Sequence, residues 1–202
     1  MTRDKSVDLL VLAGDLLGCP DGFDTVEDAQ RQDASEIVRI LQGTGVPVYY
    51  IMGNDDLVEL NSRSDHITSI HGRRVELGGV NLVGYQYSLP FMGGVYEKPE
   101  QEIRADLSQL AELVDSETIL VTHNPAYGVL DDGILDAHAG SKAILELVRD
   151  RNVRAHIHGH IHQQFGRVDR HFNVASDGRC LAMVIDLEIL TATVERDSGD
   201  SA

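Results

Sequence analysis

The stretch Ala155-His-Ile-His-Gly-His-Ile-His162 places His156, His158, His160 and His162 at every second position. Side chains alternate between the two faces of a β-strand, so on one extended strand all four imidazoles would point the same way. Imidazole nitrogen is a common metal ligand. The repeat therefore predicts a metal site, while the alternative is a polar strand edge with solvated histidines. The rest of the chain must decide between the two.

Short apolar runs alternate with helical patterns through most of the chain. Thr25, Pro99 and Ser141 start the expected helices, and in the first of these Ile37, Ile40 and Leu41 are expected to face inward. The alternation predicts an α/β domain with mixed sheets. The expected strands are 7–12, 46–52, 119–122 and 155–162, a hairpin of 74–77 and 80–84 around Gly78-Gly79, and two closing antiparallel strands at 181–187 and 189–194.

Length and composition favour one globular domain. The 202 residues are enough for a single core, which we expect over residues 1–195, followed by a disordered polar tail at 196–202. No apolar run approaches the roughly 18 residues that cross a bilayer. The N-terminus lacks the pattern of a secretory signal, so a cytoplasmic location is expected. Cys19 and Cys180 do not have the spacing of a zinc site.

The charge balance narrows the range of partners. The net charge of -16 repels nucleic acid and anionic membranes over most of the surface, so we expect neither as a partner. The chain contains 17 basic residues against 33 acidic ones, and lysine occurs only at Lys5, Lys98 and Lys142. This pattern is typical of proteins from high-salt cytoplasms and predicts a halophilic source.

Four predicted strands end at residues that can bind metal, namely Asp15, Asn54, His123, and the pair His160 and His162. Functional sites of α/β sheets lie at the carboxyl ends of the strands. Each residue alone has an ordinary structural explanation, as a turn or capping residue. Glycine precedes Asp15, Asn54 and His160, however, which leaves space for the backbone to approach one shared centre.

The donor set predicts the chemistry of the site. Carboxylate, amide oxygen and imidazole ligands without thiolate suit manganese, iron or zinc ions rather than a structural zinc site. A carboxylate can bridge two ions roughly 3.5 to 4 Å apart, an arrangement typical of hydrolases that activate water against phosphorus.

At these positions the chain resembles the calcineurin-like metallophosphoesterase superfamily. The matching motifs, in family order, are Gly14-Asp15, Gly53-Asn54-Asp55-Asp56, His123, and Gly159-His160-Ile161-His162. The resemblance implies a four-layer α-β-β-α sandwich of two mixed β-sheets. It also implies that Asp15 bridges two metals, that Asn54, His123 and His160 complete one site, and that His162 serves the other. His156 and His158 match no family ligand and are interpreted as structural or supporting residues.

Two departures from the family pattern affect the predicted chemistry. Asp55 stands where many members carry a histidine that protonates the leaving group. Diester hydrolysis depends less on a proton donor, so this position favours a phosphodiesterase, with Asp55 a weak candidate general acid. Asp56 matches the family's acidic position and is expected to support the site.

The second departure is the absence of the family's Asp-x-His motif, which precedes Asp15 by a strand and a helix and supplies ligands to the site shared with His162. Three explanations remain open. The natural protein carries this strand and helix upstream, which we favour because an unpaired strand at 7–12 would expose an apolar edge. Alternatively, the chain binds one metal through Asp15, Asn54, His123 and His160, or it has lost catalysis.

The sequence thus predicts a metal-dependent phosphoesterase that acts on small phosphodiester or nucleotide-like substrates. Its cofactor is expected to be one or two divalent ions, manganese first, with iron, zinc, nickel and cobalt as alternatives. The alternative function is a weak or inactive member that serves as a protein-binding scaffold. A nuclease subunit is a third reading, which would require arginines such as Arg73, Arg74, Arg167 and Arg170 to cluster. The exact substrate and the oligomeric state are not predicted.

Overall fold

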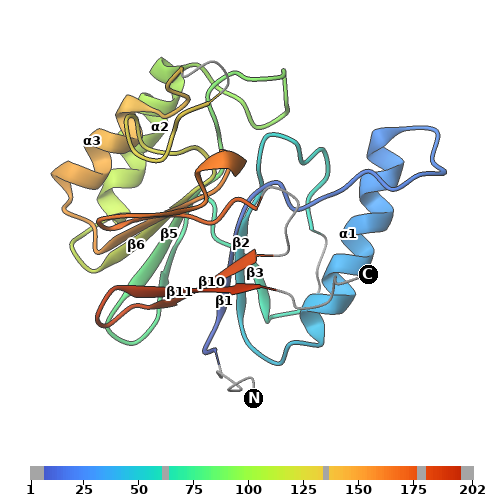
Figure 1. Cartoon of the computed structure of the whole chain (residues 1–202), viewed down its shortest axis with the longest axis horizontal. Coiled ribbons are helices and arrows are strands. Elements are labelled where there is room, and N and C mark those ends of the chain that lie inside the picture. Colours follow the sequence, from blue (N-terminus) through green and yellow to red (C-terminus); the bar gives the residue numbers. More distant parts are fainter. Residues whose placement is uncertain (1–6, 61–63, 134–136, 177–180, 197–202) are drawn as a thin grey trace.

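Two β-sheets pack face to face between helices in a computed structural model that describes residues 7–60, 64–133, 137–176 and 181–196 (Figure 1). Three apolar clusters separate the layers: one under α1, one between the sheets, and one under α2 and α3. The described chain is therefore a four-layer α-β-β-α sandwich, as the resemblance implied.

The first sheet contains three parallel strands in the order β1 (Leu10–Ala13), β2 (Val48–Ile51) and β3 (Ile67–Ser69). Helix α1 (Val26–Gln42) covers its outer face, burying Ala34 and Leu41. This helix begins where the sequence predicted, because the Thr25 side chain accepts a hydrogen bond from the Asp28 N–H (3.1 Å). Within the described residues β1 and β3 are the edge strands of this sheet.

The second sheet contains six strands, of which the central ones are parallel and buried. Helices α2 (Glu100–Leu110) and α3 (Lys142–Asp150) cover its outer face (Figure 1). Among the described residues, the short 3-10 helix η1 (Ala111–Leu113) follows α2, and η3 (His162–Gln164) follows β7. The strand order is β4 (Arg74–Glu76), β5 (Asn81–Tyr85), β6 (Thr118–Thr122), β7 (Ala155–His158), β9 (His171–Asn173) and β8 (Gly166–Val168).

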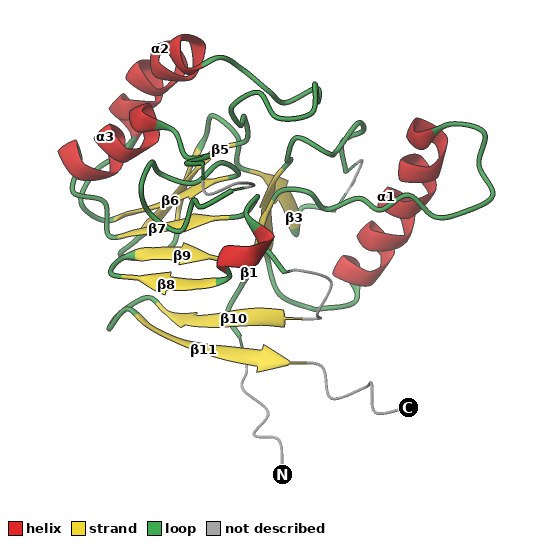
Figure 2. Cartoon of the chain, turned by 45° about the horizontal axis from the view of Figure 1, so that its top comes forward, coloured by secondary structure: helices red, strands yellow, loops and turns green. Residues whose placement is uncertain are grey.

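The closing strands form a separate hairpin, β10 (Leu181–Asp186) with β11 (Thr191–Arg196). It lies beyond β8 and near β1 in Figure 2, and Met183 and Ile185 pack against the cluster between the two sheets. The expected disordered tail was wrong at its first residue, because Arg196 pairs with Leu181 in this hairpin. The rest of that tail and Cys180 lie outside the described residues.

The structure corrects three further details of the sequence prediction. Ile40 does not face inward; it is 55% exposed on α1. Strands β3, β8 and β9 were not predicted, since each has only three residues and too little alternation to show a period. The predicted histidine strand ends at His158, so the four histidines do not share one strand face.

No described helix has both the length and the apolar character needed to cross a membrane.

Candidate metal centre

Loops from both sheets meet at the carboxyl ends of β1, β2, β6 and β7. The His123 Nε2 atom lies 3.1 Å from Asp15 Oδ2 and 2.9 Å from Asn54 Oδ1. Ligand atoms of Asp15, His123 and His160 all lie within 4.8 Å of one another. The structure therefore brings together four of the five predicted ligands, which are far apart in the sequence.

Glycines make this approach of the loops feasible. A Cβ atom on Gly53 would lie 2.2 Å from Asp15 Oδ1, and one on Gly14 would lie 2.5 Å from His123 Nδ1. The prediction that these glycines leave room for a shared centre is confirmed. Asp15 and His160 themselves have left-handed backbones, with φ of 51° and 71°, which few non-glycine residues adopt. Strain of this kind concentrates at functional sites.

Asp56 fixes the two loops that carry Asp15 and Asn54. Its buried carboxylate accepts hydrogen bonds from the N–H groups of Gly53 (2.7 Å), Leu16 (2.9 Å) and Leu17 (2.9 Å). Burial raises the pKa of Asp56 to about 6, although these three donors act in the opposite direction. Asp56 thus has the supporting position that the sequence predicted.

Gln30 also holds this loop, and sequence reasoning missed it. From α1 its side-chain amide donates to the Asp55 carbonyl (2.8 Å) and accepts from the Leu57 N–H (2.6 Å). The only signal in the sequence was a glutamine four residues before Ala34, on the buried face of the helix. A glutamine is common on helices, so its partners could be found only from the fold.

The hydrogen bonds of His123 leave a place for a cation. Its Nδ1 lies 2.9 Å from the Ala13 carbonyl and must donate there, so in the neutral ring Nε2 carries a lone pair. The Asn54 amide donates its N–H to Asp55 Oδ1 (2.7 Å), which turns Asn54 Oδ1 toward His123. Three acceptors, including Asp15 Oδ2, therefore face one another and need a proton or a metal ion between them.

The pKa values of His123 and Asp15 reflect the contact between the two side chains. Burial alone would lower the pKa of His123, but the hydrogen bond and charge of Asp15 raise it. Burial alone would raise the pKa of Asp15, but His123 lowers it. His160, whose ring centroid lies 5.0 Å from that of His123, has its pKa lowered by burial to about 4. Neutral His160 therefore offers a lone pair to the same centre.

The comparison with known proteins identifies the family. Residues 2–164 match the sequence model of the calcineurin-like phosphoesterases, Metallophos. The chain belongs to the calcineurin-like phosphoesterase family. Membership implies divalent metal ions as cofactors, and the facing acceptors of Asp15, Asn54 and His123 fit a cation of that kind.

Relatives of this calcineurin-like phosphoesterase include the UPF0046 protein K07C11.7 of Caenorhabditis elegans, 29% identical over 147 residues. That match covers 72% of the chain and 43% of the worm protein, so the chain spans less than half the length of this relative. One crystal structure superposes with a TM-score of 0.73 at 17% identity, covering 95% of this chain and 88% of the other. TT1561 of Thermus thermophilus superposes with a TM-score of 0.66 at 17% identity, covering 94% and 86%. These two likenesses support the fold.

His162, the fifth predicted ligand, lies outside the cluster. It belongs to η3, and its Nδ1 lies 2.5 Å from the Ser176 carbonyl, to which it must donate. Its neutral ring therefore has only Nε2 left for another ligand.

Asp55, the weak candidate acid, donates its N–H to Asp15 Oδ1 (3.0 Å), and its pKa is raised by burial and by the charge of Asp15.

His156 and His158 are buried, in line with their interpretation as structural residues. Ala155 and Ile157 pack into the cluster between the two sheets, so the alternating His156 and His158 lie on the opposite face of β7. Its Nε2 lies 2.8 Å from Thr122 Oγ1, and its Nδ1 lies 2.9 Å from His171 Nδ1. The Nε2 of His158 has no hydrogen-bond partner among the described residues.

A second acidic group, Asp131, Asp132 and His138, also has ligand atoms within 4.8 Å of one another. Asp131, however, already accepts hydrogen bonds from the N–H groups of Gly128 (2.9 Å) and Gly140 (3.1 Å) and from His138 (3.0 Å). Its carboxylate holds its own loop closed, so this calcineurin-like phosphoesterase has its better cation site at His123.

Proposed function

We propose that the chain hydrolyses phosphoesters with the help of divalent metal ions bound at the Asp15, Asn54, His123 and His160 cluster. The observation that carries this proposal is that two acceptor oxygens, Asn54 Oδ1 and Asp15 Oδ2, both lie within hydrogen-bond distance of His123 Nε2. A bound divalent ion would supply Lewis-acid activation of the phosphoryl group and of the attacking water.

Hydrogen bonds from neighbouring residues hold the proposed ligands in place. The Ala13 carbonyl fixes the ring of His123, so its Nε2 lone pair always points into the site. Asp55 fixes the amide of Asn54, and Asp56 and Gln30 fix the loops below it. Rigid support of this kind preorganises a site before substrate arrives.

Within this activity we propose a preference for phosphodiesters or nucleotide-like substrates. Asp55 stands where many family members carry the proton-donating histidine, and a diester with a good leaving group depends less on such a donor. Burial raises the pKa of Asp55, the charges of Asp15 and Glu97 raise it further, and His123 and His162 act in the opposite direction. A diester carries one negative charge where a monoester carries up to two, so the carboxylates of Asp15 and Glu97 repel the diester less.

The test combines metal binding with turnover. We expect protein stripped with EDTA to bind Mn²⁺ in calorimetry and to hydrolyse bis(p-nitrophenyl) phosphate. Asn54→Ala and His123→Ala should each reduce both affinity and rate by more than about tenfold. His66→Ala, an exposed histidine outside the cluster, serves as the matched control. Metal-independent hydrolysis, or equal rates in all variants, would refute the proposal.

The second candidate function is a scaffold, favoured by the edge strand β1, whose outer side pairs with no other strand among the described residues. Residues Leu10, Val11 and Leu12 are half-buried there, and such an edge can accept a further strand. The two functions differ in the assay above, because a scaffold would bind metal without metal-dependent turnover.

A further inference from the structure

Residues 88–97, which we name the rim loop, form a closed loop beside the metal centre. Its two ends are joined by hydrogen bonds from the Ser88 N–H to the Tyr96 carbonyl and from the Lys98 N–H to the Ser88 carbonyl, both 2.9 Å. The Leu89 N–H donates to Asn124 Oδ1 (3.1 Å), and Asn124 directly follows His123. The base of the rim loop is therefore tied to the strand end that carries a proposed ligand.

The tip of the rim loop is held by one carboxylate. Glu97 accepts hydrogen bonds from the N–H groups of Phe91 (2.9 Å), Met92 (2.9 Å) and Gly93 (3.0 Å). Although its partial burial acts in the opposite direction, these donors lower the pKa of Glu97, so it is ionised at neutral pH. The donors of these hydrogen bonds are all backbone N–H groups, so the shape of the tip does not depend on the side chains of Phe91 and Met92.

The rim loop touches two proposed metal ligands. Gly94 packs against Asn54 so closely that a Cβ atom on Gly94 would lie 2.1 Å from the Asn54 carbonyl oxygen. The ring of Phe91 stands edge-on to that of His160, with centroids 5.4 Å apart and an interplanar angle of 81°. The loop thus forms a wall directly beside the metal centre.

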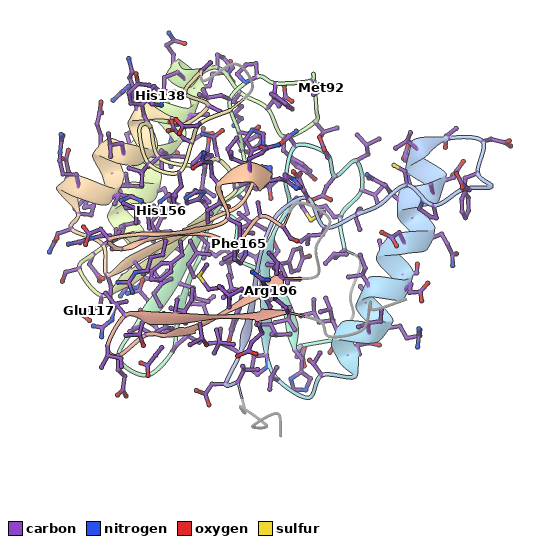
Figure 3. All side chains as sticks on the ribbon, viewed as in Figure 1. Met92, Glu117, His138, His156, Phe165 and Arg196 are labelled. Atoms are coloured by element: carbon purple, nitrogen blue, oxygen red, sulfur yellow. The ribbon has the colours of Figure 1, made fainter. Side chains whose placement is uncertain are left out.

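The wall is apolar although the centre is polar. Phe91 is 52% exposed and Met92 is 78% exposed, and Figure 3 shows Met92 projecting from the outer edge of the molecule. Single exposed apolar residues are ordinary, but here two neighbours are fixed on a tethered loop, and one touches a proposed ligand. A phosphoryl group at the metals would place its ester substituent beside this wall.

We infer that Phe91 determines substrate specificity by contacting an apolar or aromatic substituent on the phosphorus of the substrate. This inference rests on the proposed function and narrows its substrate class to phosphoesters with an aryl or comparably flat apolar group. Aromatic rings prefer edge-to-face or offset contacts, and about half of the Phe91 surface remains open for one.

The test measures binding separately from turnover. Calorimetry with Mn²⁺-loaded protein compares phenylphosphonate with methylphosphonate, which share the phosphonate group and differ in the apolar substituent. We expect the phenyl compound to bind about tenfold more tightly, which corresponds to roughly 1.4 kcal/mol. In Phe91→Ala this ratio should fall to about twofold, while methylphosphonate affinity stays unchanged, since the Glu97 bonds to the backbone persist.

Two further variants test whether the preference for the phenyl compound depends on the Phe91 side chain. Ile189→Ala removes an apolar side chain of similar exposure (68%) from the β10–β11 turn and should leave the phenyl-to-methyl ratio unchanged. Phe91→Leu retains an apolar side chain and should keep part of the preference. Equal ratios in the native protein and Phe91→Ala would overturn the inference even if diesters are hydrolysed. If both phosphonates bind with the expected ratio but nothing is hydrolysed, the proposed function fails while the inference about Phe91 stands.

Discussion

His123 Nε2 lies 3.1 Å from Asp15 Oδ2, and this contact joins the two sheets, because Asp15 follows β1 and His123 follows β6. A cation between these atoms would attach one sheet to the other. In the absence of a cation, the contact depends on a shared proton that solution pH can remove.

Metal binding should therefore stabilise the whole domain. Mn²⁺ at a hundredfold excess over its dissociation constant adds about 2.7 kcal/mol to the free energy of unfolding, if the unfolded chain does not bind it. Thermal unfolding of EDTA-treated protein, with and without Mn²⁺, measures this shift. Asp15→Asn should abolish most of it, whereas His138→Ala, in the second acidic group, should not. A shift lost only in His138→Ala would place the ion at Asp131 and Asp132 instead.

Gly53→Ala should damage the centre although it replaces none of the proposed ligands. The new Cβ atom would lie 2.2 Å from Asp15 Oδ1 and 2.4 Å from the Asp15 backbone nitrogen, so the β1 loop must move away. We expect destabilisation of about 1–3 kcal/mol, the usual cost of overpacking, together with weaker Mn²⁺ binding. Gly18→Ala is the matched control, because its nearest neighbour would be a side-chain oxygen of Asp33 at 3.4 Å. Equal Mn²⁺ affinity in both variants would contradict this role of Gly53.

Much of the site could be predicted from the sequence because its parts are local. Gly14-Asp15 and Gly53-Asn54 each follow an apolar strand, and strand ends of one sheet meet at one edge. The histidine repeat was misleading, because the positive φ of His160 takes the chain out of the strand just after His158. Periodicity alone could not reveal this turn.

The supports of the site could not be predicted, since they depend on long-range contacts. Gln30 reaches the Asp55 loop from α1, and Glu97 holds its loop through backbone N–H groups that carry no sequence signal. The short strands β3 and β9 were also missed, because three residues show no period and are fixed by pairing with β2 and β7.

Asp55→Asn tests the weak candidate general acid. If Asp55 protonates a leaving group, the variant should lose turnover most strongly on esters with poor leaving groups, such as alkyl phosphates, and little on p-nitrophenyl esters. The rates of both ester classes at saturating substrate separate the two cases. Unchanged turnover on both classes would make an acid role untenable. Loss of Mn²⁺ affinity would instead point to the hydrogen bond between Asp55 and the Asn54 amide.

The acidic surface predicts that salt stabilises the fold. With a net charge of -16, like-charge repulsion destabilises the compact state in dilute buffer, and screening at molar salt relieves it. We expect the thermal midpoint of unfolding to rise between 0.1 M and 2 M KCl. Most of this rise should also occur over the same range of NaCl. Equal midpoints in dilute and molar salt would refute the halophilic interpretation.

Asp115 should make stability depend on pH in the acid range. The hydrogen bond from Arg74 (2.7 Å) is the main reason that the pKa of Asp115 is lowered to about 2, and Asn81, Glu117 and Thr118 also donate to it. Because the folded pKa lies below the unfolded value of about 3.9, the native state favours the carboxylate. Its contribution is present above about pH 4 and is lost as pH falls toward about 2.

Asp115→Asn removes the charge and tests this dependence. The side chain is 48% exposed, so solvent screening limits the expected difference to less than about 1 kcal/mol above pH 5. Urea unfolding of the native protein and the variant between pH 6 and pH 3 should show this difference shrinking, because Asp115 takes up a proton in the unfolded chain before it does so in the folded one. Glu112→Gln, which removes an exposed carboxylate from the neighbouring η1, is the control for net charge. A difference that stayed constant with pH would mean that Asp115 acts through hydrogen bonds that asparagine also accepts, rather than through its charge on Arg74.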